Sequence, residues 1–101
     1  MRRALVVLLP VLLLAGCASS PDASYLSSVR QGIPALVEVP DKDLTHLGHQ
    51  LCDALDTRGF DDGMAMFITE SAKAGLNAEN VRHISRAAVT AYCPEFSREV
   101  G

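Results

Sequence analysis

The sequence predicts an all-α fold: a small four-helix domain with one disulfide, preceded by a cleaved lipoprotein signal peptide. Three observations predict it. A short basic and aliphatic leader precedes the first cysteine. After that leader, apolar residues recur at three- and four-residue spacing between helix-ending glycines and prolines. The other two cysteines form an even pair. With 101 residues, 49% of them hydrophobic and 21% charged, the chain has room for one globular domain.

The leader has the features of an export signal. Residues 1–3, Met-Arg-Arg, form a short basic head, residues 4–14 are almost wholly aliphatic, and two small residues precede Cys17. The apolar run of 11 residues is well short of the roughly 20 that span a bilayer, and Pro10 interrupts it. We therefore expect residues 1–16 to be removed during export.

The end of the leader also predicts an anchor. Residues 14–17 read Leu-Ala-Gly-Cys, a lipobox in which the cysteine thiol accepts a diacylglyceryl group before cleavage. We expect lipidation at Cys17, which places the protein on the extracytoplasmic side of the cell membrane. Two or more acyl chains, at about 0.8 kcal/mol per buried methylene, hold a small domain there. The alternative is an ordinary secretory signal that is cut elsewhere, for instance after Ala18.

The charge of the mature chain limits its partners. Removal of the leader leaves 85 residues with seven basic and twelve acidic side chains, a formal charge of −5. Such a charge disfavours nucleic acid and anionic lipid as partners, so the expected membrane contact is the lipid on Cys17. We divide the chain into a signal peptide (residues 1–16), a lipidated tether (17–24), a helical domain (25–96) and a tail (97–101).

Cys52 and Cys93 remain once Cys17 is assigned to the anchor. Thiols oxidise outside the cytoplasm, so a disulfide is the expected state of this pair. The two positions lie 41 residues apart, and closing a loop of that length is worth about 4 kcal/mol in chain entropy. A zinc site with nearby histidines is the alternative, although the chain has no Cys-x-x-Cys pair.

The first helix is expected over residues 21–31. Ser20 supplies a hydroxyl cap and Pro21 suits the first helical position. Gly32 and Pro34 end this helix, and the connector that follows has no clear conformation.

The second helix is expected over residues 42–58. Gly59 closes it, and Gly48 leaves room for another segment to approach closely. Its apolar positions form one stripe: Leu44, Leu47, Leu51, Ala54 and Leu55.

The third helix is expected over residues 62–74, with Asp61 as its cap and Gly75 at its end. One face carries Met64, Phe67, Ile68, Ser71 and Ala72. The fourth is expected over residues 78–92, where Asn77 can act as the cap. The expected core contains Leu47, Leu51, Leu55, Phe67, Ile84, Ala88 and Tyr92.

Two segments around the cysteines carry a family pattern. Residues 48–56 read Gly-His-Gln-Leu-Cys-Asp-Ala-Leu-Asp, and Ala-Ala-Val at residues 87–89 precedes Ala-Tyr-Cys-Pro at residues 91–94. With these segments the chain resembles the DUF732 family, small exported actinobacterial proteins of which many are lipoproteins. The resemblance covers about residues 25–96. It implies a small helical domain with its two cysteines joined, and it implies no activity.

His46, His49 and Asp53 are the candidate metal ligands, because they share one polar strip of a helix. Three ligands on one strip still need a fourth and a surrounding set of partners, and solvated helix surface explains them equally well. The resemblance instead implies that the His49 imidazole packs beside the disulfide or hydrogen-bonds Asp53 or Asp56. We therefore expect no metal and no cofactor.

The sequence offers no catalytic pattern. It contains no Ser-His-Asp order, no nucleophile elbow and no phosphate-binding glycine loop. We therefore expect a non-enzymatic envelope lipoprotein whose exposed face binds an envelope protein. The alternative is a carrier for a small hydrophobic ligand, because many alanines and single glycines can leave space between helices.

Overall fold

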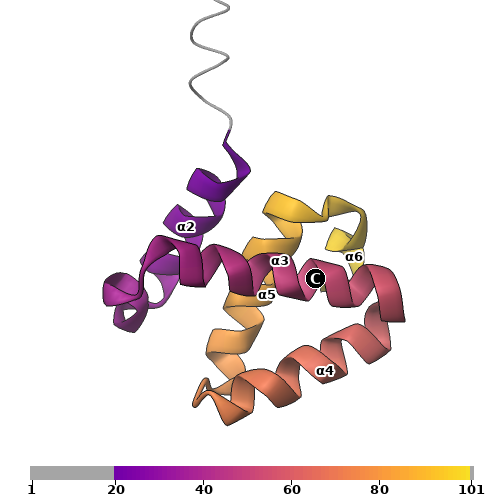
Figure 1. Cartoon of the computed structure of the whole chain (residues 1–101). Coiled ribbons are helices and arrows are strands. Elements are labelled where there is room, and N and C mark those ends of the chain that lie inside the picture. The colour runs from indigo at the N-terminus through magenta and orange to yellow at the C-terminus, as the bar shows by residue number, and fades with distance from the viewer. Residues whose placement is uncertain (1–19, 101) are drawn as a thin grey trace, which may run out of the picture.

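The computed structural model describes residues 20–100, and all the regular structure in that range is helical (Figure 1). The expected signal peptide and the expected lipidation site at Cys17 lie outside the described residues. No helix in this part of the chain is both long enough and apolar enough to cross a bilayer. The elements, in order, are α2 (Pro21–Gly32), η1 (Pro34–Glu38), α3 (Asp41–Arg58), α4 (Phe60–Lys73), α5 (Ala78–Tyr92), η2 (Pro94–Phe96) and α6 (Ser97–Val100).

The all-α prediction is confirmed, but the number of helices was wrong. Five α-helices lie in residues 20–100 where four were expected, because the segment after Pro94 forms η2 and α6. Phe96 and Val100 pack against the core, and the Phe96 ring lies 6.4 Å from that of Phe60. These apolar side chains explain why the chain turns back onto the domain after α5.

Most helix ends follow the expected chemistry. Ser20 Oγ accepts a hydrogen bond from the amide of Ala23, and Asn77 Oδ1 accepts one from the amide of Asn80. Asp61 was wrongly expected to cap α4. The backbone of Gly59, with φ at 87°, turns directly from α3 into α4, so the helix begins at Phe60 and Asp61 lies in its first turn. A carboxylate there still favours the helix dipole.

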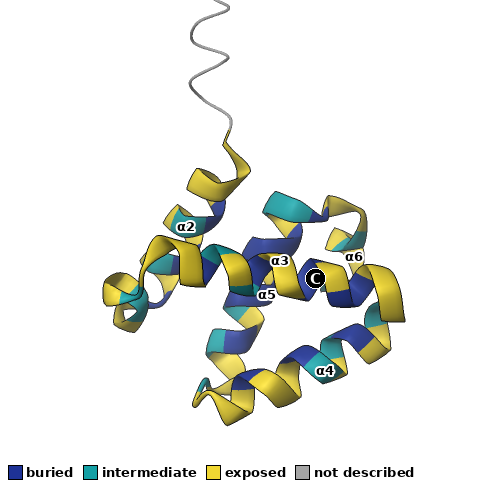
Figure 2. Cartoon of the chain, viewed as in Figure 1, coloured by how far each residue is buried: buried dark blue, intermediate teal, exposed yellow. Residues whose placement is uncertain are grey.

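α3 and α5 supply most of the core. Of the residues expected inside, Leu51, Leu55, Phe67, Ile84 and Ala88 are buried, whereas Leu47 and Tyr92 are only partly buried against the core. Figure 2 shows this pattern, with buried residues on the facing sides of these helices and exposed residues over much of α4.

The expected inward position of Ile68 was wrong. Its exposed fraction is 49%, and Ala72 on the same face is exposed too. The reason is a narrow contact face on α4, made by Gly63, Phe67 and Ser71 at four-residue spacing. Gly63 lies so close to α3 that an added Cβ would come within 2.7 Å of the carbonyl oxygen of Ala54.

Candidate functional site

The two cysteines expected to pair, Cys52 and Cys93, form a disulfide that joins α3 to the residue after α5. Their Cα atoms are 5.9 Å apart, and their exposed fractions are 7% and 2%. The expected bridge is confirmed. Because both sulfurs lie in the bond and are buried, a structural role fits them better than a redox role, which needs an accessible thiol.

A polar cluster near this disulfide joins the start of α2 and the end of α5 to the middle of α3. Tyr92 Oη donates a hydrogen bond to Asp22 Oδ1 at 2.5 Å. The ring of His49 stacks on that of Tyr92, with centroids 3.9 Å apart, and its Nε2 lies 3.5 Å from the same Asp22 oxygen. We call Asp22, His49 and Tyr92 the Tyr92 cluster. It connects the first turn of α2 with α3 and with the last turn of α5.

The ring of Tyr25 packs against this cluster. Its hydroxyl donates a hydrogen bond to the carbonyl of Leu44 at 2.7 Å, and its ring lies 5.2 Å from that of Tyr92. A Cβ added at Gly48 would come within 2.9 Å of both tyrosine rings. The close approach expected at Gly48 is therefore confirmed, and the two rings are the groups that make it.

Both tyrosines stay protonated at neutral pH. Burial raises the pKa of Tyr25 to about 12. Burial also raises the pKa of Tyr92, and the hydrogen bond to Asp22 and the charge of that carboxylate raise it further. Each phenol is therefore held as a hydrogen-bond donor, and neither is suited to act as a base or nucleophile near neutral pH.

The candidate metal strip does not assemble. His46 is exposed, and the His49 imidazole faces Asp22 and Tyr92. Of the two arrangements that the resemblance implied, packing beside the disulfide or a hydrogen bond to Asp53 or Asp56, the second is therefore not formed. The stacking on Tyr92 explains the difference, because it turns the ring toward α2 and α5. Within residues 20–100, no group of three or more His, Cys, Asp and Glu side chains is arranged to hold a metal ion.

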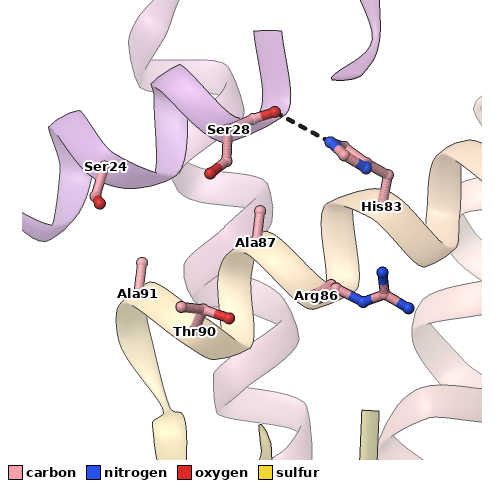
Figure 3. A pocket seen from close by; sticks show the side chains of 7 residues that line it. All are labelled: Ser24, Ser28, His83, Arg86, Ala87, Thr90 and Ala91. Carbon is pink, nitrogen blue, oxygen red and sulfur yellow. Dashed lines mark hydrogen bonds between the residues drawn. The ribbon is translucent and has the colours of Figure 1, made fainter. Parts of the chain in front are cut away.

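A shallow groove of about 200 Å³ runs between α2 and α5. In Figure 3, Ser24 and Ser28 line its α2 side, while Ala87 and Ala91 rise from α5 below them. His83 closes one end by a contact of 3.0 Å between its Nε2 and the carbonyl oxygen of Ser28. Since a carbonyl only accepts, Nε2 carries the proton.

Gly32 makes room for this histidine. A Cβ at Gly32 would lie 1.8 Å from the Nε2 atom of His83. The imidazole thus fills the space beside the last turn of α2 and fastens that helix to α5. This is a structural contact, and apart from His83 and Arg86 the groove is lined by small side chains and hydroxyls.

A larger and more apolar cavity lies between α4, α5 and α6. Its volume is about 360 Å³, and we call it the α4–α6 cavity. Arg82 and Glu99 are the charged side chains among its described lining residues, and neither forms an ion pair with another residue in the range 20–100. The lining is Phe60, Met64, Ile68, Ala78, Val81, Arg82, Ser85, Glu99 and Val100.

Comparison with protein families gives one match. The sequence model of the family described as "Protein of unknown function (DUF732)" matches residues 21–95. The chain belongs to the DUF732 family. Comparison with curated proteins and with solved structures finds no match.

The DUF732 match covers some of these features and not others. The disulfide, the Tyr92 cluster and the groove between α2 and α5 all lie within residues 21–95. The α4–α6 cavity does not, because Glu99 and Val100 follow the matched segment. One wall of this cavity is therefore added to the DUF732 domain by the C-terminal tail.

Sequence reasoning missed Asp22, His83 and the cavity residues as site components. By its position Asp22 indicates only an acidic residue in the first turn of a helix, and its partner Tyr92 is 70 residues away. His83 carries a usable signal, because it is the one histidine in the apolar-striped segment 78–92. The cavity carries none, since it depends on a tail that has no pattern of its own.

Proposed function

We propose that this DUF732 protein is a lipid-anchored extracytoplasmic module that binds another envelope protein and catalyses no reaction. The observation that carries the proposal is the buried disulfide between Cys52 and Cys93. Such bonds form and persist in oxidising compartments. The disulfide therefore supports the export that the leader and the lipobox at Cys17 predict.

The proposed anchor restricts where the domain lies. Only four residue steps separate Cys17 from Pro21, the first residue of α2. Extended chain spans at most about 3.5 Å per residue, so the start of α2 stays within about 14 Å of the acylated cysteine. The Tyr92 cluster, which holds that first turn, then lies near the membrane surface. α4 contributes no residue to that cluster, so its exposed side is free to contact a partner.

The exposed side of α4 supports the binding role. Ile68 is one of two large hydrophobic side chains that the described residues expose, and it lies at the edge of the α4–α6 cavity. A single exposed apolar residue is common on protein surfaces. An exposed isoleucine next to an apolar pocket offers a partner both a protruding side chain and a pocket to fill. Such pairs are typical of the centres of protein–protein interfaces.

In vivo photo-crosslinking tests this proposal. A photoreactive residue at position 68 should yield a crosslink to one envelope protein, whereas the same residue at Glu70 should not. Residues two apart on a helix point about 200° from each other, so Glu70 is a matched control on the opposite side of α4. Equal crosslinking from both positions, or none from Ile68, would contradict the binding role.

The anchor is tested separately by mass. The protein extracted from membranes should exceed the 85-residue chain by at least a diacylglyceryl group, and Cys17→Ser should remove this increment. An unmodified protein whose first residue lies beyond Cys17 would refute the lipid anchor.

A second candidate function is that of a carrier for a small hydrophobic molecule. The α4–α6 cavity favours it, because about 360 Å³ lies within the range of small-molecule sites and the walls are mainly hydrocarbon. Protein purified from membranes should then release a small apolar compound on solvent extraction, in amounts that approach one per chain.

A further inference from the structure

The α4–α6 cavity has the size of one short hydrocarbon chain. Its volume is about 360 Å³. If each non-hydrogen atom takes about 30 Å³, the share of a water molecule in the liquid, the cavity holds about a dozen atoms. That matches the chain of a medium-length fatty acid. A phospholipid with two acyl chains is more than twice too large.

The walls of the cavity suit such a chain. Met64 and Ile68 come from α4, Val81 from α5 and Val100 from α6, and Phe60 closes the end near the start of α4. These side chains present hydrocarbon and the Met64 thioether, and the Ser85 hydroxyl that also lines the cavity donates its hydrogen bond to the carbonyl of Val81. Burial of a methylene among them is worth about 0.8 kcal/mol, which favours a flexible aliphatic chain as the occupant.

The charge at the edge of the cavity selects the head group. Arg82 follows the buried Val81 on the 15-residue helix α5, so the core holds its backbone while its side chain is exposed at the edge of the cavity. Its guanidinium forms no ion pair with another residue of the described range. Glu99 lies on the four-residue helix α6 at the end of the chain. The planar guanidinium matches the two oxygens of a carboxylate, and it is the better-fixed of the two charges.

We propose that the α4–α6 cavity binds a free medium-chain fatty acid, with its hydrocarbon chain between α4 and α5 and its carboxylate at Arg82. This inference rests on the second candidate function, that of a carrier, and it names the ligand class. The formal charge of −5 expected for the mature chain repels anions in general. Preference for a carboxylate over a neutral head group must therefore come from Arg82 itself.

Photoaffinity labelling tests the assignment on the full chain. Washed membranes that contain the protein are incubated with dodecanoic acid that carries a diazirine near its methyl end, and are then irradiated. The labelled peptide should contain Met64, Ile68 or Val81. Unlabelled dodecanoate should compete for labelling at lower concentration than dodecanol does.

Two arginine variants supply the matched comparison. Arg82→Gln and Arg86→Gln remove the same charge from the same helix, but Arg86 lines the groove between α2 and α5 instead of the cavity. The concentration of dodecanoate that halves labelling should rise about fivefold in Arg82→Gln, as expected for one partly exposed ion pair. It should stay within about twofold in Arg86→Gln. Glu99→Gln should lower it, because a repelling carboxylate is lost.

The contrary results have separate meanings. An equal loss in both arginine variants, or stronger competition by dodecylamine than by dodecanoate, overturns the carboxylate assignment and leaves the carrier function standing. Labelling confined to peptides outside α4, α5 and α6 overturns the site. Absence of any saturable labelling overturns both the inference and the carrier function. The anchored protein-binding role is judged independently by the crosslink from Ile68.

Discussion

Tyr92 donates a hydrogen bond to Asp22 and so joins the last turn of α5 to the first turn of α2, across 70 residues of sequence. The contact fastens α2, the helix that follows the proposed lipid anchor, to α5. His49 adds a stacked ring and an imidazole nitrogen near the same carboxylate. The three residues thus hold the start of α2 against α3 and α5.

Tyr92→Phe removes the hydroxyl from this contact and keeps the ring. We expect the free energy of unfolding to fall by about 1 kcal/mol, the usual net value of a hydrogen bond. Urea unfolding measures it. Tyr92→Phe in an Asp22→Asn background should cost less than in the native chain, since the two side chains act on each other. Additive losses would show that the contact contributes nothing.

The two tyrosines predict how stability depends on alkaline pH. Burial raises the pKa of Tyr25 to about 12, and burial together with Asp22 raises the pKa of Tyr92. In the unfolded chain both phenols titrate near pH 10. The folded protein therefore holds more protons above that pH, and stability must fall as the pH rises from about 10 upward.

Tyr25→Phe should reduce this alkaline loss, because the buried phenol no longer has to stay protonated. The measurement is the free energy of unfolding from urea titrations between about pH 8 and pH 11. Replacing an acidic residue far from both rings, as in Glu79→Gln, serves as the control. If the native chain and Tyr25→Phe lost stability in parallel across this range, the linkage to Tyr25 would be disproved.

Local sequence patterns predicted most of the secondary structure, because caps and apolar spacing are properties of neighbouring residues. Ser20 and Asn77 cap the helices that they were expected to cap. The disulfide followed from the cysteine count and the expected compartment. Ile68 was misplaced because its burial depends on which face of α4 packs against α3, which no local pattern reports.

The site was less predictable than the fold, for the same physical reason. The bond between Asp22 and Tyr92 depends on how α2 crosses α5, and the α4–α6 cavity depends on a tail that packs through Phe96 and Val100. Both arise from tertiary packing between distant segments. His46 and Asp53 show the opposite error. Their spacing on one helix made them candidate metal ligands, but within the described residues they belong to no group of three or more metal-ligating side chains.

Reduction of the disulfide should loosen the whole domain. The bridge closes a loop of 41 residues, and loss of that constraint is worth about 4 kcal/mol. Thermal unfolding with and without a reductant measures the change. The paired substitution Cys52→Ala and Cys93→Ala should reproduce it, whereas Cys17→Ser should not. An unchanged midpoint after complete reduction would exclude a structural role for the bridge.

Gly63→Ala tests the contact that positions α4. The added Cβ would lie 2.7 Å from the carbonyl oxygen of Ala54 and 2.9 Å from the backbone nitrogen of Leu55. Backbone atoms of a packed helix cannot rotate away as a side chain can, so α4 must shift from α3. Such overpacking costs about 1 to 3 kcal/mol, which outweighs the roughly 1 kcal/mol that alanine gains over glycine in a helix.

We therefore expect Gly63→Ala to lower the free energy of unfolding by about 1 kcal/mol in urea titrations. Thr69→Ala, at an exposed position of the same helix, is the control and should leave stability nearly unchanged. The shift of α4 should also alter the α4–α6 cavity, since Met64 is the next residue along the helix. Stabilisation by Gly63→Ala would mean that helix propensity outweighs the contact, and that α4 is not held against α3 at this glycine.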